Sequence, residues 1–246
     1  MKSLMQGRRH LLLLNLGSLA TAEWLPTDIG GCVLWLRSDL AYQDAAKTVP
    51  CVADSLIWTG ENKSGLGHDV VQATEAKRPI YLTNQVNGLP AWDFDTTDDY
   101  LKAVAFTWNQ PEVIYLVLKS DLGYVRRIMD GNGNDSGTVY TWNPPINSIS
   151  MYAGSGIDTG LQPGVNTWFI LRIIFNGANS SARVNNGTPV TGDAGTSNMG
   201  GFTLGMRADG ITQPFDGQFA EVIGYNAIPS DANDTLIMDY LTGRYL

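Results

Sequence analysis

One short stretch of the sequence gathers acidic residues at a spacing that could serve acid–base chemistry or bind a hard cation. Its members are Asp93, Asp95, Asp98 and Asp99. Alternation along an extended strand places Asp93 and Asp95 on one face, where a glycoside hydrolase could use them as its two carboxyl groups. Calcium takes about six to eight oxygen ligands, and two on one face fall well short of that number. We therefore interpret the stretch as a strand end and a turn in which Asp side chains cap backbone amides.

A second oxygen-rich stretch lies in a predicted turn between two strands. It contains Asp130, Asn132, Asn134 and Asp135. These residues are typical of turns, and they offer a similarly incomplete set of ligands for calcium. We predict no metal site and no cofactor, with calcium at the first acidic stretch as the alternative.

Aromatic residues in or near predicted loops form the third candidate. An exposed aromatic ring can stack on the apolar face of a sugar, while neighbouring Asn and Asp side chains bind its hydroxyl groups. Any one of these rings could instead pack against the rim of the core. As a group we interpret them as a carbohydrate-binding surface, formed by Trp108, Tyr124, Tyr140, Trp142 and Tyr152.

A single carboxylate stands in the middle of an alternating stretch, residues 215–226. Strict alternation places Glu221 on the side of Phe219, Ile223 and Tyr225. A charge in mid-strand is costly unless it is paired or exposed. Glu221 is therefore either a catalytic acid in a groove or a structural hydrogen-bond acceptor within a sheet.

Composition indicates the kind of fold that positions these side chains. The chain has 246 residues with 27 glycines and 16% charged residues, which suits short strands joined by many turns. This length fits one large all-β domain. The net charge of −8 disfavours nucleic acid and anionic membranes as partners.

Cysteine and histidine are too sparse to form a recognisable metal motif. The two cysteines, Cys32 and Cys51, could form a single bridge, although two reduced thiols are the simpler interpretation. The two histidines, His10 and His68, lie far apart in the sequence. They cannot form a zinc site without other ligands.

Hydrophobic patterning predicts strands along most of the chain and one helix at its end. Residues 32–36, 113–119 and 167–176 are apolar runs typical of buried strands. After Ser230, a plausible N-cap, apolar residues recur at helical spacing up to Tyr245. We expect one short C-terminal helix that covers the sheet structure.

Residues 1–23 differ from the rest of the chain, and we expect them to form an extended N-terminal arm that docks on another subunit or on its own domain. Basic and apolar residues follow one another there: Arg8, Arg9, Leu11, Leu12, Leu13 and Leu14. The same pattern, followed by Ala20 and Ala22, also matches a secretory signal peptide. The apolar run is too short to span a bilayer.

Five segments in order resemble a known fold family, namely residues 24–39, 87–101, 166–177, 215–226 and 228–241. They are similar to the laminin-G-like, concanavalin A-like lectin/glucanase jelly rolls, in the version found in bacteriophage virion proteins and bacterial surface proteins. The resemblance implies an all-β, two-sheet antiparallel jelly-roll sandwich over residues 24–246. Phage relatives often begin with a basic, leucine-rich segment, which favours the arm over the signal peptide.

The resemblance also bears on catalysis. Glucanases of this fold carry E-x-D-x-x-E on one strand, so that two carboxyl groups face the cleft. In this sequence Ile223 and Asn226 stand at the second and third of those positions. The glucanase activity is therefore not carried over, and we predict that Glu221 is a structural polar residue and that the chain is not an enzyme.

Together these observations predict a structural or adhesion protein of a virion, either a capsid decoration or a tail-fibre component. The arm would attach it to other virion proteins, the loops would bind host or environmental glycans, and the chain would be a homo-oligomer or part of a large assembly. One alternative is a secreted bacterial carbohydrate-binding module. The other is a glycoside hydrolase that uses an atypical pair such as Asp93 and Asp95.

Overall fold

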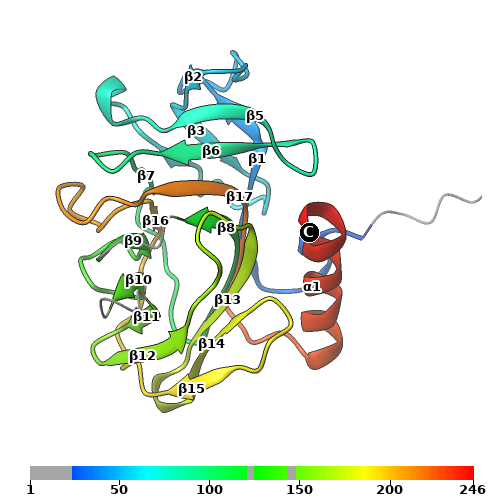
Figure 1. Cartoon of the computed structure of the whole chain (residues 1–246), viewed down its shortest axis with the longest axis vertical. Helices are drawn as coiled ribbons and strands as arrows, with labels where there is room; N and C mark the ends of the chain where they lie inside the picture. Colours follow the sequence, from blue (N-terminus) through cyan, green and yellow to red (C-terminus); the bar gives the residue numbers. More distant parts are fainter. Residues whose placement is uncertain (1–23, 121–124, 143–147) are drawn as a thin grey trace, which may run out of the picture.

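The computed structural model describes residues 24–120, 125–142 and 148–246, apart from the side chain of Trp142. Over these residues the chain is an antiparallel β-sandwich with one C-terminal helix (Figure 1). The predicted all-β fold class is therefore confirmed. The predicted arm, residues 1–23 with Arg8, Arg9 and the four leucines, lies outside the described residues.

The first sheet contains the longest strands. Its order across the sheet is β15 (Val190–Gly192), β14 (Ser180–Val184), β13 (Phe169–Phe175), β8 (Glu112–Ser120), β17 (Gly217–Tyr225), β1 (Cys32–Tyr42) and β3 (Thr59–Asn62). β8 lies beside β17 along its whole length, but on the other edge the start of β17 pairs with β6 (Leu89–Phe94) rather than β1. From β6 the sheet continues through β5 (Ile80–Val86) to β2 (Ser55–Leu56). One strand, β17, thus joins two branches of this sheet.

The second sheet is built from shorter strands. Its order is β4 (Val70–Val71), β7 (Leu101–Ala103), β16 (Thr203–Leu204), β9 (Arg127–Asp130), β10 (Thr138–Trp142), β11 (Ser148–Tyr152) and β12 (Gly156–Leu161). Pairing of β3 with β4 connects the two sheets along one side. Short 3-10 helices occur in the connections at Pro26–Asp28, Glu75–Lys77 and Gly177–Asn179.

The main core lies between the two sheets. Large side chains from both sheets meet there, among them Trp92, Phe94, Leu116, Met151 and Phe219. In β8, alternate residues such as Leu116 face this core, whereas Tyr115 and Val117 face a second cluster outside the sheet. Burial on both faces explains why β8 and β13 read as continuous apolar runs.

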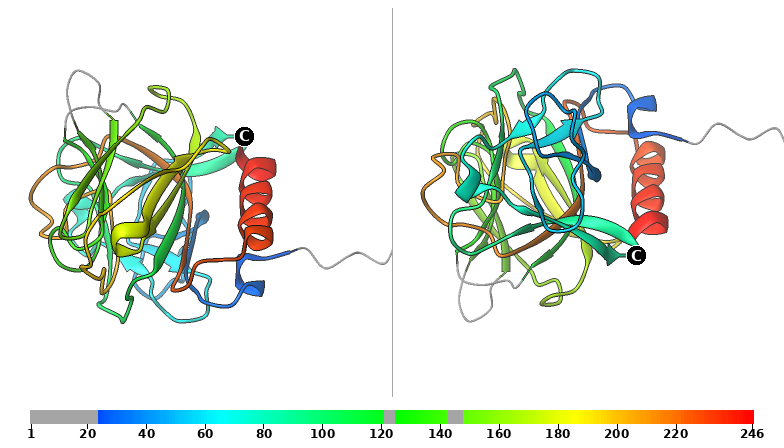
Figure 2. Two further views of the ribbon diagram at one scale, coloured as in Figure 1. Left: turned by 90° about the horizontal axis from the view of Figure 1, so that it is seen from below. Right: turned by 90° about the horizontal axis from the view of Figure 1, so that it is seen from above.

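Helix α1 (Asp231–Tyr245) covers the outer face of the first sheet, as Figures 1 and 2 show. Ile237 and Leu241 pack there against Tyr115 and Ile223. Ser230 caps the helix, since its hydroxyl accepts a hydrogen bond from the Asn233 amide at 3.3 Å. The predicted C-terminal helix and its N-cap are therefore confirmed.

The alternation predicted for β17 is wrong at its centre. A register shift between Phe219 and Glu221 places two successive residues, Ala220 and Glu221, on the outer face. Phe219 instead faces the main core. A β-bulge inserts one residue into the strand and reverses the phase of everything after it, which a strict period of two cannot anticipate.

The start of the described chain lies against the C-terminal helix. Trp24, the first described residue, packs edge-on against Tyr240 of α1 with ring centroids 5.5 Å apart. Cys32 and Cys51 are both free thiols. Among the described residues, no helix has both the length and the apolar character needed to cross a membrane.

Candidate functional site

A cleft of about 310 Å³ lies on the outer face of the second sheet and combines aromatic and polar side chains. We call it the tyrosine cleft; its lining is Val125, Arg127, Asp135, Tyr140, Tyr152 and Gln213. Two of the five predicted carbohydrate-binding aromatics, Tyr140 and Tyr152, thus meet in one cleft. The other lining residues come from β9 and from three loops.

Strand register explains why these side chains share a face. Tyr140 lies directly opposite Ser150 of β11 and Arg127 of β9, and Thr138 lies opposite Tyr152. Residues opposite one another in a sheet, and residues two apart along a strand, point to the same side. Their neighbours point into the main core, for example Val139. The sheet therefore presents Arg127 and both tyrosines outward.

Arg127 is held rigidly on this face. Its guanidinium carbon lies 4.5 Å from the centre of the Tyr140 ring. Its Nε donates to Gln213 Oε1 at 2.5 Å and its NH2 donates to Asp135 Oδ1 at 2.8 Å. Burial lowers the pKa of Arg127, while the charges of Asp135 and Asp130 oppose that shift.

Asp135 lies between two arginines. Its Oδ1 accepts from Arg127, and its Oδ2 accepts from Arg207 NH2 at 2.6 Å. Arg207 also forms an ion pair with Asp209 at 3.4 Å. Charges of both signs therefore alternate along this edge of the cleft and balance one another.

A buried carboxylate fixes the loops that carry Asp135 and Arg207. Asp130 is fully buried. It accepts hydrogen bonds from the Thr138 hydroxyl at 2.6 Å and from the backbone amides of Gly131, Asp135 and Ala208. Burial raises the pKa of Asp130 and these hydrogen bonds lower it. One side chain thereby fixes the positions of two loops around the cleft.

The predicted second oxygen-rich stretch is held together by protein groups. Asp130 and Asp135 accept from the donors described above, and Asn134 Nδ2 donates weakly to Asp209 at 3.5 Å. The Lys102 ammonium donates to the carbonyl of Asn132 at 3.0 Å and to that of Ala208 at 2.9 Å. An ammonium group thus satisfies the carbonyl oxygens that a hard cation would use.

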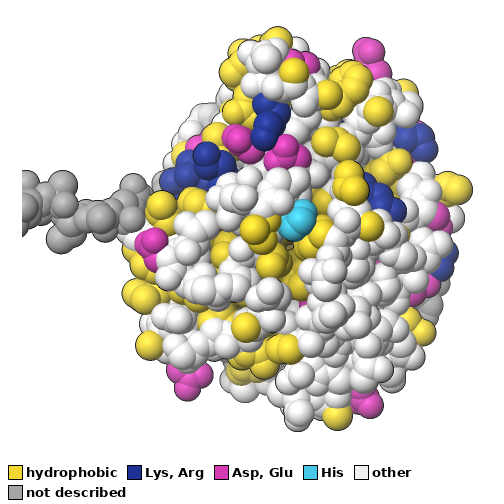
Figure 3. All heavy atoms as spheres, turned by 180° about the vertical axis from the view of Figure 1, so that it is seen from behind, with side chains coloured by type: hydrophobic (Ala, Val, Ile, Leu, Met, Phe, Trp, Pro, Cys, Tyr) yellow, Lys and Arg dark blue, Asp and Glu magenta, His cyan; other side chains and the backbone are white. Residues whose placement is uncertain are grey.

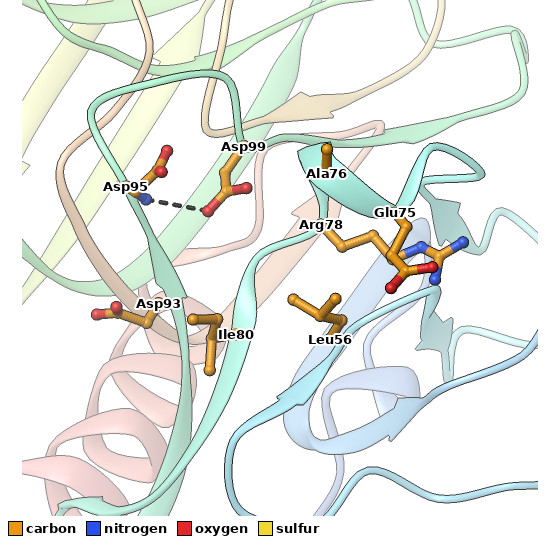
Figure 4. Close-up of a pocket in the computed structure, with 8 residues that line it drawn as sticks. All are labelled: Leu56, Glu75, Ala76, Arg78, Ile80, Asp93, Asp95 and Asp99. Carbon is orange, nitrogen blue, oxygen red and sulfur yellow. Dashed lines mark hydrogen bonds between the residues drawn. The ribbon is translucent and has the colours of Figure 1, made fainter.

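A second cleft, of about 420 Å³, lies beside β5 and β6. We call it the aspartate cleft; its lining is Leu56, Glu75, Ala76, Arg78, Ile80, Asp93, Asp95 and Asp99 (Figure 4). Leu56 and Ile80 supply its apolar part. Three of the four predicted acidic residues line it, and Asp98 lies close by, within the same carboxylate cluster.

Most of these acids are engaged with the chain itself. Asp95 Oδ1 accepts from the backbone amides of Thr97 at 2.8 Å and Asp98 at 3.3 Å, and Asp99 Oδ2 accepts from the Asp95 amide at 3.1 Å. Asp93 accepts from Gln218 Nε2 at 2.8 Å. Burial, reinforced by the neighbouring carboxylates, raises the pKa of Asp99 to about 6. The stretch forms a turn capped by Asp side chains.

The predicted shared face of Asp93 and Asp95 is wrong. Strand β6 ends at Phe94, so Asp95 already belongs to the turn. In Figure 4 the two carboxylates point in different directions. The carboxylates of Asp95, Asp98 and Asp99 have oxygens within 4.8 Å of one another. They would supply three oxygen ligands, whereas calcium takes about six or more.

The other three predicted carbohydrate-binding aromatics are Trp108, Tyr124 and Trp142. Trp108 is fully buried, and its indole Nε1 donates to the Tyr225 carbonyl at 3.2 Å. It packs in the main core, so its predicted exposure to sugars is wrong. Tyr124 and the side chain of Trp142 lie outside the described residues.

Glu221 lies in neither cleft. It is buried beneath α1, where its carboxylate accepts from Trp35 Nε1 at 2.7 Å, Tyr240 at 2.9 Å and Tyr245 at 2.6 Å. Burial raises the pKa of Glu221, and these hydrogen bonds lower it. The carboxylate therefore connects the first sheet to the helix.

Sequence patterns did not indicate Arg127 or Gln213. Gln213 is 86 residues from Arg127 along the chain, and it adopts a left-handed backbone conformation with φ of 61°. No local periodicity links two such positions. On the face shown in Figure 3, the visible basic side chains are scattered and form no continuous basic stripe.

No family model matches the sequence, and no curated protein matches it either. Solved structures do share the fold. A GH54 α-L-arabinofuranosidase soaked with a cyclic sulfate inhibitor is 14% identical with a TM-score of 0.62, covering 87% of this chain and 63% of that chain. An arabinofuranosidase complexed with arabinofuranosyl-α-1,2-xylobiose is 16% identical with a TM-score of 0.57, covering 78% and 52%.

A third similar structure is a mutant of HCR/D, 11% identical with a TM-score of 0.54, covering 85% of this chain and 51% of that chain. This chain thus spans between about half and two thirds of the length of these proteins. At such identities the similarity shows the fold alone. The β-sandwich of this protein is one that glycoside hydrolases also contain.

Proposed function

We propose that this chain is a non-enzymatic glycan-binding module and that the tyrosine cleft is its binding site. The observation that carries the proposal is the convergence of Tyr140, Tyr152, Arg127, Asp135 and Gln213 on one outward face. Sugar-binding sites in proteins combine aromatic side chains, which pack on the apolar faces of the sugar rings, with a few fixed polar groups that form hydrogen bonds to the sugar hydroxyls. This cleft has both components.

Preorganisation supports the proposal. The strands fix Arg127 and the tyrosines, and buried Asp130 fixes the loop that carries Asp135. A site whose polar groups are already in place loses less conformational entropy when a ligand binds. The similar arabinofuranosidase bound to an arabinofuranosyl-xylobiose adds that a protein of this fold can bind saccharide.

The lining of the tyrosine cleft supports binding rather than glycoside hydrolysis. Glycoside hydrolysis commonly needs two carboxyl groups on either side of the scissile bond. Asp135 is the one carboxylate among the described residues that line the tyrosine cleft, and two arginines flank it. The alternative, hydrolysis at Asp93 and Asp95, is tested by assaying β-glucans with the wild type and with Asp93→Asn. Turnover that the substitution abolishes would establish that alternative.

Direct binding tests the main proposal. A glycan array on the full chain should show saccharide ligands, and Tyr152→Ala should abolish their binding while leaving the fold intact. Tyr42→Ala is the matched control, because Tyr42 is also a half-buried tyrosine at a strand end but lies in β1. Retention of full glycan affinity by Tyr152→Ala would refute the tyrosine cleft as the site.

We also propose a setting for this module, on the resemblance of the sequence to phage virion proteins. Residues 1–23 would attach it to other virion proteins as part of a large assembly, and its cleft would bind glycans outside the particle. Deleting residues 1–23 should abolish incorporation into particles. A secreted bacterial module is the competing interpretation, and N-terminal sequencing of the mature protein would reveal the removal of residues 1–22.

A further inference from the structure

We propose that the tyrosine cleft selects neutral sugars over acidic sugars and that Asp135 sets this selection. The inference rests on the proposed glycan-binding function and specifies its ligand class. It follows from the charges around the cleft, from the hydrogen bonds that Arg127 already makes, and from the donor that remains on Gln213.

The cleft has no uncommitted cation among the described residues that line it. Arg127 is the single cation in that set, and its guanidinium already donates to Asp135 at 2.8 Å and to Gln213 at 2.5 Å. These two hydrogen bonds use two of the five guanidinium N–H groups, and the charge of Arg127 is already paired with that of Asp135. A sugar carboxylate beside Arg127 would therefore compete with Asp135 for the same charge, which offsets the gain.

Asp135 also acts directly against an acidic ligand. Its carboxylate lines the cleft, and its second oxygen is paired with Arg207 at 2.6 Å. A ligand carboxylate placed in the cleft would meet this like charge at close range in a partly desolvated site. Asp135 and Asp209 together balance Arg127 and Arg207, so the cleft offers an anion no net attraction.

A neutral sugar meets none of these obstacles. Gln213 Oε1 accepts from Arg127, and no acceptor for Gln213 Nε2 occurs within the described part of the chain. That amide can donate to a sugar hydroxyl, and Asp135 can accept from another. Tyr152 supplies an aromatic ring for the apolar face of the sugar. A volume of about 310 Å³ is at the lower end of small-molecule sites and suits a short saccharide.

Substitution of Asp135 should change the preference. Asp135→Asn keeps the shape of the side chain, replaces one acceptor oxygen by an amide donor, and removes one of the two negative charges, with Asp209, that balance Arg127 and Arg207. The variant cleft then carries uncompensated positive charge. Its affinity for acidic sugars should rise and depend strongly on salt, because attraction between exposed charges is screened.

The test uses the full chain and matched saccharide pairs that differ only at C6, such as galactose with galacturonic acid and glucose with glucuronic acid, each presented as a short oligosaccharide. Wild type should bind the neutral member at least about tenfold more tightly, with little change between low and high salt. Asp135→Asn should reduce that ratio to about one or invert it. Asp54→Asn is the control, because Asp54 is exposed on the loop before β2 and the substitution removes the same charge.

Each outcome decides the inference. Binding of acidic members by the wild type as tightly as neutral ones would overturn it and leave the glycan-binding function standing. Binding of neither class would overturn both. An unchanged ratio in folded Asp135→Asn would overturn the role of Asp135. If Asp135→Asn does not fold, Arg127→Gln serves instead: it removes the cleft cation and should lower affinity for acidic sugars further, and a rise in that affinity would contradict the inference.

Discussion

Glu221 of β17 and Asp234 of α1 both link the C-terminal helix to the first sheet, one carboxylate coming from the sheet and the other from the helix. Glu221 is a sheet carboxylate that accepts from two helix tyrosines, Tyr240 and Tyr245. Asp234 is a helix carboxylate that pairs with two sheet arginines, Arg172 at 2.7 Å and Arg183 at 2.6 Å. One carboxylate acts near each end of the helix, so its position along the sheet is fixed at two points.

Removal of the Glu221 carboxylate should destabilise the protein strongly. Glu221→Ala leaves Trp35 Nε1 and two tyrosine hydroxyls without an acceptor in a buried site. We expect a loss of about 3 kcal/mol or more in the free energy of unfolding, measured by urea denaturation. Glu61→Ala is the control, because its pairing with Lys47 at 3.4 Å is partly exposed and worth under about 1 kcal/mol. Similar losses in the two variants would refute the argument.

Removal of Asp234 should release the first turns of the helix. Asp234→Ala leaves two mostly buried guanidinium groups unpaired, and breaking such a pair costs about 3–5 kcal/mol. The segment should also become sensitive to proteases and exchange its amide hydrogens faster. Asp231→Ala tests the helix dipole alone and should cost about 0.5 kcal/mol. An Asp234 variant as stable as the Asp231 variant would contradict this role.

Stability should fall as pH rises because of Glu112. This residue is fully buried; its Oε1 accepts from the Met199 amide at 2.7 Å, and its Oε2 has no partner among the described residues. Burial raises the pKa of Glu112 from 4.5 to about 8. Between those values the folded state keeps a proton that the unfolded state has lost, so unfolding becomes easier with increasing pH.

Glu112→Gln should remove that pH dependence. Wild type should lose on the order of 4 kcal/mol of unfolding free energy between about pH 4.5 and pH 8 from this group. The Gln variant cannot ionise and still accepts from Met199, so its profile should be flatter and its stability at pH 8 higher. Glu75→Gln, in an exposed 3-10 helix, should leave the profile unchanged. Parallel profiles for wild type and Glu112→Gln would exclude Glu112 as the cause.

Substitution of Trp108 should change stability without changing glycan affinity, and substitution of Tyr152 should do the reverse. Trp108→Ala removes a fully buried ring from the main core and should cost about 3–5 kcal/mol. The molecules that remain folded should bind glycans with unchanged affinity. Tyr152→Ala should show the opposite pattern, with a small stability change and lost binding. Thermal unfolding and glycan titration on both variants measure this, and loss of binding in folded Trp108→Ala would contradict it.

The sequence was informative where one local pattern determines the structure. Apolar runs predicted β8 and β13, and helical spacing after Ser230 predicted α1, because burial imposes its period directly on neighbouring residues. The β-bulge beside Glu221 has no such signature, since it inserts one residue without changing composition. Its presence decides which residues face the helix.

The candidate site was predictable only in part. Tyr140 and Tyr152 were predicted as sugar-binding residues from their aromatic type. Asp135 was considered only as a possible oxygen ligand for calcium. Trp108 was assigned to the same surface because it lies in a predicted loop, although tertiary packing places its ring in the core. Arg127 and Gln213 meet through a contact across 86 residues, and long-range pairing of that kind leaves no trace in either local segment.

The edge-on contact between Trp24 and Tyr240 has a consequence for display. Trp24, at the start of the described chain, thus lies against the last turns of α1, which ends at Tyr245. Both ends of the described domain therefore lie on the α1 side of the molecule, here called the α1 pole (Figure 1). The two sheets separate that pole from the tyrosine cleft. Copies attached by either end would therefore present their tyrosine clefts away from the point of attachment. Under the proposed glycan-binding function, avidity would then strengthen a weak single-site affinity by about 100-fold or more.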